Sequence, residues 1–211
     1  MSRPVLTYVF DAYCGWCYGF SPAFAALVEH VGDRADIRVV NGGLFIDDRS
    51  KPIGSFGHIP QANERISQLT GVTFGPDYEQ VLREGTLVMD SLDAAAGFNA
   101  LRNAAPERET ELPSAIQHAW YRNGRSLSDP ATYAQIARDF GLDGDAVAAD
   151  AASEAARDQA REEFAAADEL GVHEYPTLLL TVDGVTRRLG GPVTKPDQLI
   201  AQFETAVARS D

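Results

Sequence analysis

The two cysteines of the chain, Cys14 and Cys17, are its clearest candidates for chemistry. They lie in the run Tyr-Cys-Gly-Trp-Cys-Tyr, between an apolar segment typical of a strand and a helical pattern. At such a junction, unpaired N–H groups and the positive dipole end of the helix stabilise the thiolate of the first cysteine. The second cysteine is one helical turn further on, where it is able to attack a mixed disulfide on the first. This spacing predicts a reversible two-electron redox pair.

Two other roles for the cysteines compete with redox chemistry. Two thiolates are half of a zinc site, and free cysteine is a common core residue. However, no second Cys-x-x-Cys exists, and metal-ligand spacing is absent from the four histidines, His30, His58, His118 and His173. A purely structural role would not explain two thiols at a helix N-terminus. We therefore expect no metal ion.

Composition and charge narrow the class of protein. With 211 residues, 45% of them hydrophobic, the chain can build one core carrying a sizeable insertion. The net charge of -13 repels phosphate and anionic lipid, so we expect no nucleic-acid partner and no membrane association. The first residues lack the pattern of a secretory signal, which predicts a cytoplasmic protein. In that compartment a Cys-x-x-Cys is more often catalytic, redox-sensing or metal-binding than a permanent cross-link.

Strand and helix patterns at the two ends of the chain surround the cysteines. Residues 4–10 predict a strand buried on both faces, and 36–40 predict a second, parallel strand. The helix between them should end near Gly32, with a kink or a restart at Ser21-Pro22. Near the other end, two strands over 175–182 and 185–189 are joined by the turn Asp183-Gly184, and a closing helix covers 195–208.

The middle of the chain has almost no strand pattern. We expect helices there over 60–69, 86–105, 112–123 and 130–140, and a long helix over about 145–170 with room for one break. The order βαβ, helices, ββα predicts an α/β protein with a thioredoxin fold, a central mixed sheet and a large all-helical insertion. The predicted thioredoxin-like domain comprises 1–57 and 156–211, and the inserted helical domain comprises 58–155.

Tyr175-Pro176 is the second motif of interest. Proline at the start of a strand cannot donate to a ladder, and in a thioredoxin fold this position faces the redox pair. A cis bond would expose the Tyr175 backbone toward Cys14, ready to pair with an added peptide strand. An ordinary trans proline that begins a strand is the alternative.

Two stretches carry a resemblance to a known family: residues 10–17, Phe-Asp-Ala-Tyr-Cys-Gly-Trp-Cys, and residues 170–177, Leu-Gly-Val-His-Glu-Tyr-Pro-Thr. Together with the helical insertion, they resemble the DsbA-like thioredoxin superfamily, and more narrowly its cytoplasmic FrnE-like branch of protein disulfide isomerases. The resemblance implies that Cys14 attacks, that Cys17 resolves, and that Pro176 is a cis-proline shaping substrate binding. The chain departs from the family in its Gly-Trp dipeptide, which supplies no histidine cation beside the Cys14 sulfur.

Three residues near the two motifs are candidates for substrate binding or proton transfer. Trp16 is either a solvent-facing aromatic that contacts substrate or a side chain that folds onto the insertion, and Tyr175 is a second substrate-binding candidate. Asp11, three residues before Cys14, is a candidate helix cap or proton acceptor.

We expect a thiol-disulfide oxidoreductase or isomerase acting on peptide, protein or small-molecule disulfides and dithiols. It needs no cofactor, although glutathione is a candidate thiol co-substrate. One alternative is a glutathione-dependent enzyme like kappa-class glutathione transferases or 2-hydroxychromene-2-carboxylate isomerases, which typically carry serine at the position matching Cys14. Another is a non-catalytic redox-sensing module. Neither the direction of exchange nor the oligomeric state follows from the sequence.

Overall fold

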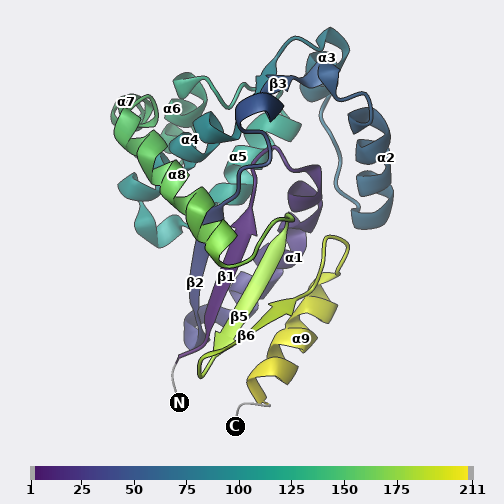
Figure 1. Ribbon diagram of the computed structural model, residues 1–211, viewed down its shortest axis with the longest axis vertical. Helices are drawn as coiled ribbons and strands as arrows, with labels where there is room; N and C mark the ends of the chain where they lie inside the picture. Colours follow the sequence, from purple (N-terminus) through teal and green to yellow (C-terminus); the bar gives the residue numbers. More distant parts are fainter. Residues whose placement is uncertain (1–2, 209–211) are drawn as a thin grey trace.

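A four-stranded mixed sheet with strand order β2-β1-β5-β6 forms the centre of the molecule. The computed structural model describes residues 3–208 (Figure 1). Strand β1 (Val5–Phe10) pairs in parallel with β2 (Asp36–Asn41) and antiparallel with β5 (Thr177–Val182), which also pairs antiparallel with β6 (Val185–Leu189). The predicted fold class, a thioredoxin fold carrying a helical insertion, is confirmed.

Helix α1 (Gly15–Val31) begins directly after Cys14, contains Cys17 in its first turn and packs against α9 (Pro196–Ala208). The predicted restart at Pro22 is wrong, because the helix is continuous. Proline lacks the N–H that would bond the carbonyl of Tyr18, and the Ser21 hydroxyl donates to that carbonyl instead, at 2.8 Å.

Most of the remaining helices come after β2 and before β5 in the sequence. They are α2 (Ile59–Thr70), α3 (Pro76–Glu84), α4 (Ser91–Ala104), α5 (Leu112–Tyr121), α6 (Pro130–Asp139), α7 (Gly144–Ala151) and α8 (Glu154–Glu169). Figure 1 shows α2 to α7 gathered at one end of the sheet. Helix α8 covers a face of the sheet, where Ala167 packs against Val9 of β1.

Two details of the insertion differ from the sequence prediction. The expected helix over 86–105 begins only at Ser91, because the Asp90 carboxylate caps it by accepting from the N–H groups of Leu92 and Asp93. The residues before it form β4 (Val88–Met89), which pairs with β3 (Lys51–Pro52). Helix α3 was not predicted, and the break expected near 145–170 separates α7 from α8.

The proposed domain division at 58 and 155 stays a prediction, and its outer ends, residues 1–2 and 209–211, lie outside the described residues. Strand β3 belongs to the first predicted thioredoxin segment but pairs with β4 of the insertion. None of the helices within residues 3–208 is long and apolar enough to cross a membrane.

Candidate active site

Cys14 occupies the N-cap position of α1, immediately before the first helical residue. Its own N–H donates to the Asp11 carbonyl at 3.0 Å, which closes the loop leading out of β1. The first turn of α1 contains no acidic residue, so no carboxylate there opposes a negative charge on the sulfur. A thiolate at this position therefore faces the positive end of a 17-residue helix.

Cys17 lies one turn further along α1 and is fully buried, whereas the Cys14 residue keeps 6% of its surface exposed. Both cysteines are free thiols. Burial raises the pKa of Cys17 well above its usual value, and the hydrogen-bonding contact with Cys14 raises it further. The arrangement separates an outer sulfur that an incoming disulfide reaches from an inner one protected from solvent.

The turn before β5, from the other end of the chain, lies against Cys14. The Tyr175–Pro176 peptide bond is cis, and the Cys14 thiol donates to the Tyr175 carbonyl at 3.4 Å. The Tyr175 hydroxyl accepts from the N–H of Gly43 at 3.2 Å. A Cβ atom on Gly42 would lie 2.3 Å from the tyrosine ring, so only glycine leaves space for it. The residues after β2 thus hold the side chain of Tyr175, and the backbone carbonyl of the same residue contacts Cys14.

Asp11 is buried and links two loops of the site. Its carboxylate accepts from the N–H groups of Tyr13 and Leu44, both at 2.9 Å. Burial raises the pKa of Asp11 to about 6, against the lowering effect of its hydrogen bonds. The helix-cap alternative for Asp11 is wrong, because its side chain bonds N–H groups outside α1 and Cys14 takes the cap position.

An aromatic pocket of about 160 Å³ lies beside Cys14. Trp16 is half-buried and lines this pocket together with residues of the insertion, among them His58, Ile59, Met89, Trp120 and Tyr121. Trp16 packs against the core and also lines the pocket, and its contact with substrate stays a prediction. The pocket could accept an apolar group adjoining a substrate sulfur.

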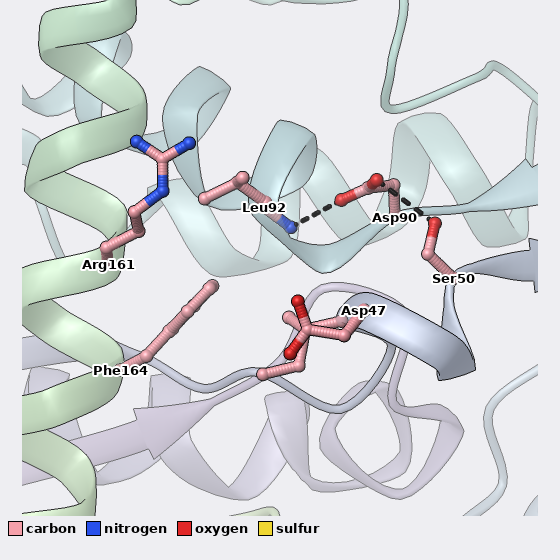
Figure 2. A pocket seen from close by; sticks show the side chains of 7 residues that line it. Asp47, Ser50, Asp90, Leu92, Arg161 and Phe164 are labelled. Carbon is pink, nitrogen blue, oxygen red and sulfur yellow. Dashed lines mark hydrogen bonds between the residues drawn. The ribbon is translucent and has the colours of Figure 1, made fainter.

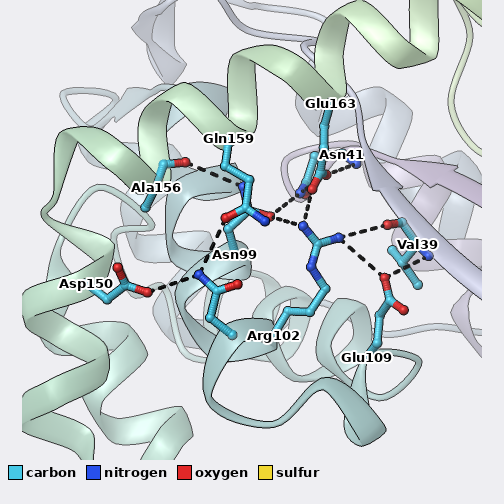
Figure 3. A network of polar contacts seen from close by, with 10 residues as sticks. Val39, Asn41, Asn99, Arg102, Glu109, Asp150, Ala156, Gln159 and Glu163 are labelled. Atoms are coloured by element: carbon cyan, nitrogen blue, oxygen red, sulfur yellow. Dashed lines mark hydrogen bonds and ion pairs between the residues drawn. The ribbon is translucent and has the colours of Figure 1, made fainter.

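A polar network fixes the end of β2 that carries this arrangement (Figure 3). Glu163 of α8 accepts from the backbone N–H and the side-chain amide of Asn41 at 2.9 and 2.7 Å, and it pairs with Arg102 of α4. Arg102 also donates to the Val39 carbonyl at 3.2 Å. Two helices are thereby tied to the last residues before Gly42.

A larger pocket, of about 600 Å³, lies away from the cysteines between α8 and the loop after β2 (Figure 2). Phe164 and Arg161 of α8 face Asp47 and Asp90 across it. Neither cysteine lines this pocket. Cys14 lines the smaller pocket instead, so the smaller pocket is the one that adjoins a candidate reactive sulfur.

Among residues 3–208, no group of three or more histidine, cysteine or acidic side chains is placed to hold a metal ion. Sequence reasoning missed the roles of Gly42 and Gly43, although a glycine pair directly after a strand is a usable signal for a close backbone approach. It also missed Phe45 and Met89, whose types give no hint that they line a pocket.

Comparisons with a family model and with solved structures show which proteins the chain is similar to. The family model described as "DSBA-like thioredoxin domain" matches residues 5–199. The structure of the cytosolic disulfide reductase DsbM from Pseudomonas aeruginosa is 30% identical in sequence, with a TM-score of 0.83 and coverage of 97% of this chain and 99% of that one. The structure of DsbM with GSH superposes with a TM-score of 0.79, again at 30% identity, and covers 97% of this chain and 99% of that one.

More distant structures share the fold alone. A structure from Nitrosomonas europaea, provisionally described as a protein disulfide isomerase, is 20% identical with a TM-score of 0.84, and each chain is covered completely. A 2-hydroxychromene-2-carboxylate isomerase is 19% identical with a TM-score of 0.64, covering 97% of this chain and 95% of that one. No curated protein matches the sequence.

Proposed function

The chain belongs to the DSBA-like thioredoxin domain family, and on that premise we propose that it exchanges disulfides through Cys14 and Cys17. The observation that carries the proposal is the 3.4 Å contact between the Cys14 sulfur and the Tyr175 carbonyl, at the start of a helix and beside a second free thiol. Cys14 is the attacking thiol and Cys17 the resolving thiol.

The reaction has two exchange steps. The Cys14 thiolate attacks one sulfur of a substrate disulfide, the substrate S–S bond breaks, and the first substrate sulfur leaves as a thiolate. Cys17 then loses its proton and attacks the Cys14 sulfur, which releases the second substrate sulfur and leaves Cys14 and Cys17 joined. Asp11 is the proposed proton acceptor, because a carboxyl with a pKa of about 6 is ionised at neutral pH.

The turn at Tyr175–Pro176 is the proposed docking edge for substrate. In the reduced protein the Tyr175 carbonyl accepts from the Cys14 thiol, and that carbonyl loses its donor when Cys14 becomes a thiolate. It is then free to accept an N–H from an extended peptide segment next to the reacting disulfide. Trp16 contacts the same substrate from the aromatic pocket.

We infer that exchange runs in the reductive direction in the cytoplasm, with glutathione as thiol co-substrate. Support comes from the 30% identity to a protein described as a cytosolic disulfide reductase, of which a structure with GSH exists. No organic cofactor or metal is needed for exchange between sulfurs.

The test is reduction of insulin by the protein with glutathione as the thiol source. Wild-type protein should turn over, and Cys14→Ser should not. Cys17→Ser should still form a mixed disulfide on Cys14 and stop there. Insulin reduction that persists in Cys14→Ser would contradict the assignment of Cys14 as the attacking thiol. The reduction potential of the pair, measured against a glutathione series, then separates a reductase from an oxidant or isomerase.

The second candidate function is the alternative raised from the sequence, a glutathione-dependent enzyme that does not use its own thiols; the 2-hydroxychromene-2-carboxylate isomerase structure, at 19% identity, shares the fold. The presence of both Cys14 and Cys17 argues against it. Glutathione binding that leaves the thiol titration unchanged would favour it. A non-catalytic redox sensor would instead show negligible turnover and a partner affinity that depends on the state of the pair.

A further inference from the structure

Three large apolar side chains line the pocket of about 600 Å³ between α8 and the loop after β2, which the exchange reaction described so far does not use. They belong to Ile46, Leu92 and Phe164, and each is partly exposed. None of the three packs against either of the two hydrophobic cores found among residues 3–208. Apolar side chains that line a concave site without supporting a core are typical of a binding site. This lining therefore indicates a ligand that carries an apolar group.

A second pocket, of about 280 Å³, adjoins the first and leads to the turn beside Cys14. Ile46 and Phe164 line both pockets, and Tyr175 lines the second one. A Cβ atom on Gly43 would lie 3.1 Å from Ile46 Cδ1 and 3.4 Å from Phe164 Cδ2, so any side chain there would crowd the two that the pockets share. We call the two pockets together the α8 trough. It begins at the residue whose carbonyl contacts the Cys14 sulfur and ends at the start of α4.

The far end of the trough, at the start of α4, is acidic. Arg161 donates to Glu154 and Asp158 at 2.7 and 2.6 Å, so its positive charge is already compensated. Asp90 accepts from N–H groups at the start of α4. Asp47 also lines this end, and within the described part of the chain its carboxylate makes no hydrogen bond or ion pair (Figure 2). A free carboxylate beside an apolar surface favours a ligand that combines an apolar group with a cation.

The near end of the trough, beside Tyr175, has a different charge distribution. Arg49 lines it and donates to the Gly43 carbonyl at 3.0 Å. Asp168 and His173 line it as well and contact each other at 3.4 Å. The Arg49 cation disfavours a second positive charge at this end. A ligand that suits both ends therefore has its apolar group near the docking turn and its cation further along the trough.

We propose that the α8 trough binds the substrate next to its reacting cysteine, and that the preferred substrate is an extended peptide with a large apolar residue near that cysteine and a lysine or arginine further along. The apolar side chain lies against Phe164, and the cation pairs with the Asp47 carboxylate. The inference rests on the exchange reaction proposed above, whose bond changes stay the same. The Cys14 sulfur bonds to the peptide sulfur, the substrate S–S bond breaks, and the partner sulfur leaves as a thiolate.

The test compares two disulfides in a Cys17→Ser background, where the mixed disulfide on Cys14 accumulates. The first probe is the homodimeric disulfide of a short peptide with a central cysteine and with leucine and then lysine on both sides of it. The second probe is oxidised glutathione, which has no large apolar side chain. Samples are quenched in acid at increasing times, and intact mass gives the rate of adduct formation for each probe.

Phe164→Ala should lower the ratio of the peptide rate to the glutathione rate by about tenfold, since it removes the apolar surface that both pockets share. Leu92→Ala, which changes only the far end, should lower the ratio in the same direction. Asp47→Asn should slow the peptide by about twofold to fivefold, the range of an exposed ion pair, and this loss should vanish when glutamine replaces the peptide lysines. Urea unfolding should show that the variants remain folded.

Leu69→Ala is the matched control, because this leucine of α2 is also exposed but lines neither pocket. It should leave both rates unchanged. Rate ratios that stay at the parent value in both Phe164→Ala and Leu92→Ala would overturn the proposal.

Failure of the proposed function has a different signature, namely no adduct on Cys14 with either probe. In that case the same peptide with serine in place of its cysteine still tests the trough, because its binding needs no reaction. Its affinity, measured by calorimetry, should weaken in Phe164→Ala and stay unchanged in Leu69→Ala. Equal affinities in the parent and in Phe164→Ala would overturn the proposal.

Discussion

Replacing Gly42 with alanine perturbs the support of the turn beside Cys14 without touching either cysteine. Gly42 follows β2 and does not have a positive φ, so its backbone conformation is open to alanine. The added Cβ would lie 2.3 Å from two ring carbons of Tyr175 and 2.7 Å from its hydroxyl oxygen. Contacts this short cannot persist, so the ring must move.

The magnitude follows from two contributions. Overpacking a tight site costs about 1–3 kcal/mol. Displacement of the ring also breaks the hydrogen bond from Gly43 to the Tyr175 hydroxyl, which is worth about 1 kcal/mol. We expect Gly42→Ala to lower the free energy of unfolding by about 2–4 kcal/mol. Because Tyr175 also presents its backbone carbonyl to Cys14, formation of a mixed disulfide between Cys14 and glutathione should slow as well.

Urea unfolding measures the stability, and acid-quenched adduct formation measures the rate at Cys14. Gly57→Ala is the matched control, because a Cβ there meets nothing within 4 Å, and its unfolding should stay at the wild-type value. In a Tyr175→Ala background the ring is absent, so Gly42→Ala should cost almost nothing. An equal cost of Gly42→Ala in both backgrounds would refute the steric argument.

Three further perturbations test other parts of the site. Glu163→Ala should lower the free energy of unfolding by about 3 kcal/mol, since it leaves the Arg102 guanidinium partly buried without a main partner, and Glu163→Gln should cost less in the same urea titration. Asp11 has its pKa raised from 3.8 to about 6, so its ionised form is disfavoured in the folded state, and stability is lost as pH rises from about 4 to 6. Asp11→Asn should abolish this loss, which amounts to about 3 kcal/mol over that pH range, and urea midpoints that vary with pH in the same way in both proteins would contradict this. A Cβ on Gly15 would lie 2.8 Å from Ile66 Cδ1, so Gly15→Ala should destabilise by about 1 kcal/mol and be rescued by Ile66→Val in a double-mutant cycle.

The parts of the fold that could be predicted from sequence are those with strong local signals. The strand over 4–10 is a run of apolar and β-branched residues, and helix α6 starts at Asp129-Pro130, where the carboxylate accepts from the Ala131 N–H at 2.9 Å as an N-cap should. The position of Cys14 and Cys17 at the start of a helix could be predicted for the same reason, since a strand pattern precedes them and a helical pattern follows them. Local chemistry sufficed in each case.

What could not be predicted depends on contacts between distant segments. Strands β3 and β4 are two residues each, too short for a periodic pattern, and they exist because they pair with one another across 36 positions of sequence. The cap alternative for Asp11 fails because its second partner, the N–H of Leu44, belongs to a distant segment that only the fold brings close.

The structure shows a packing role for the Gly-Trp dipeptide between the cysteines, because Gly15 lies close to helix α2. Sequence alone links these two residues to the strength of the redox couple. However, Gly15 and Gly19 lie one turn apart on α1, and a Cβ on either would meet Ile66 of α2 at 2.8 and 3.0 Å. Glycine at position 15 is thus favoured by the close approach of Ile66 in the insertion, independently of the sulfur chemistry. Helix α2 in turn supplies Ile59 and Ala62 to the pocket beside Cys14. A substitution at Gly15 therefore displaces a wall of the pocket beside Cys14. Because this displacement alone changes activity, the reduction potential of the variant must be measured separately. Only a change in that potential would show that the Gly-Trp dipeptide sets the direction of exchange.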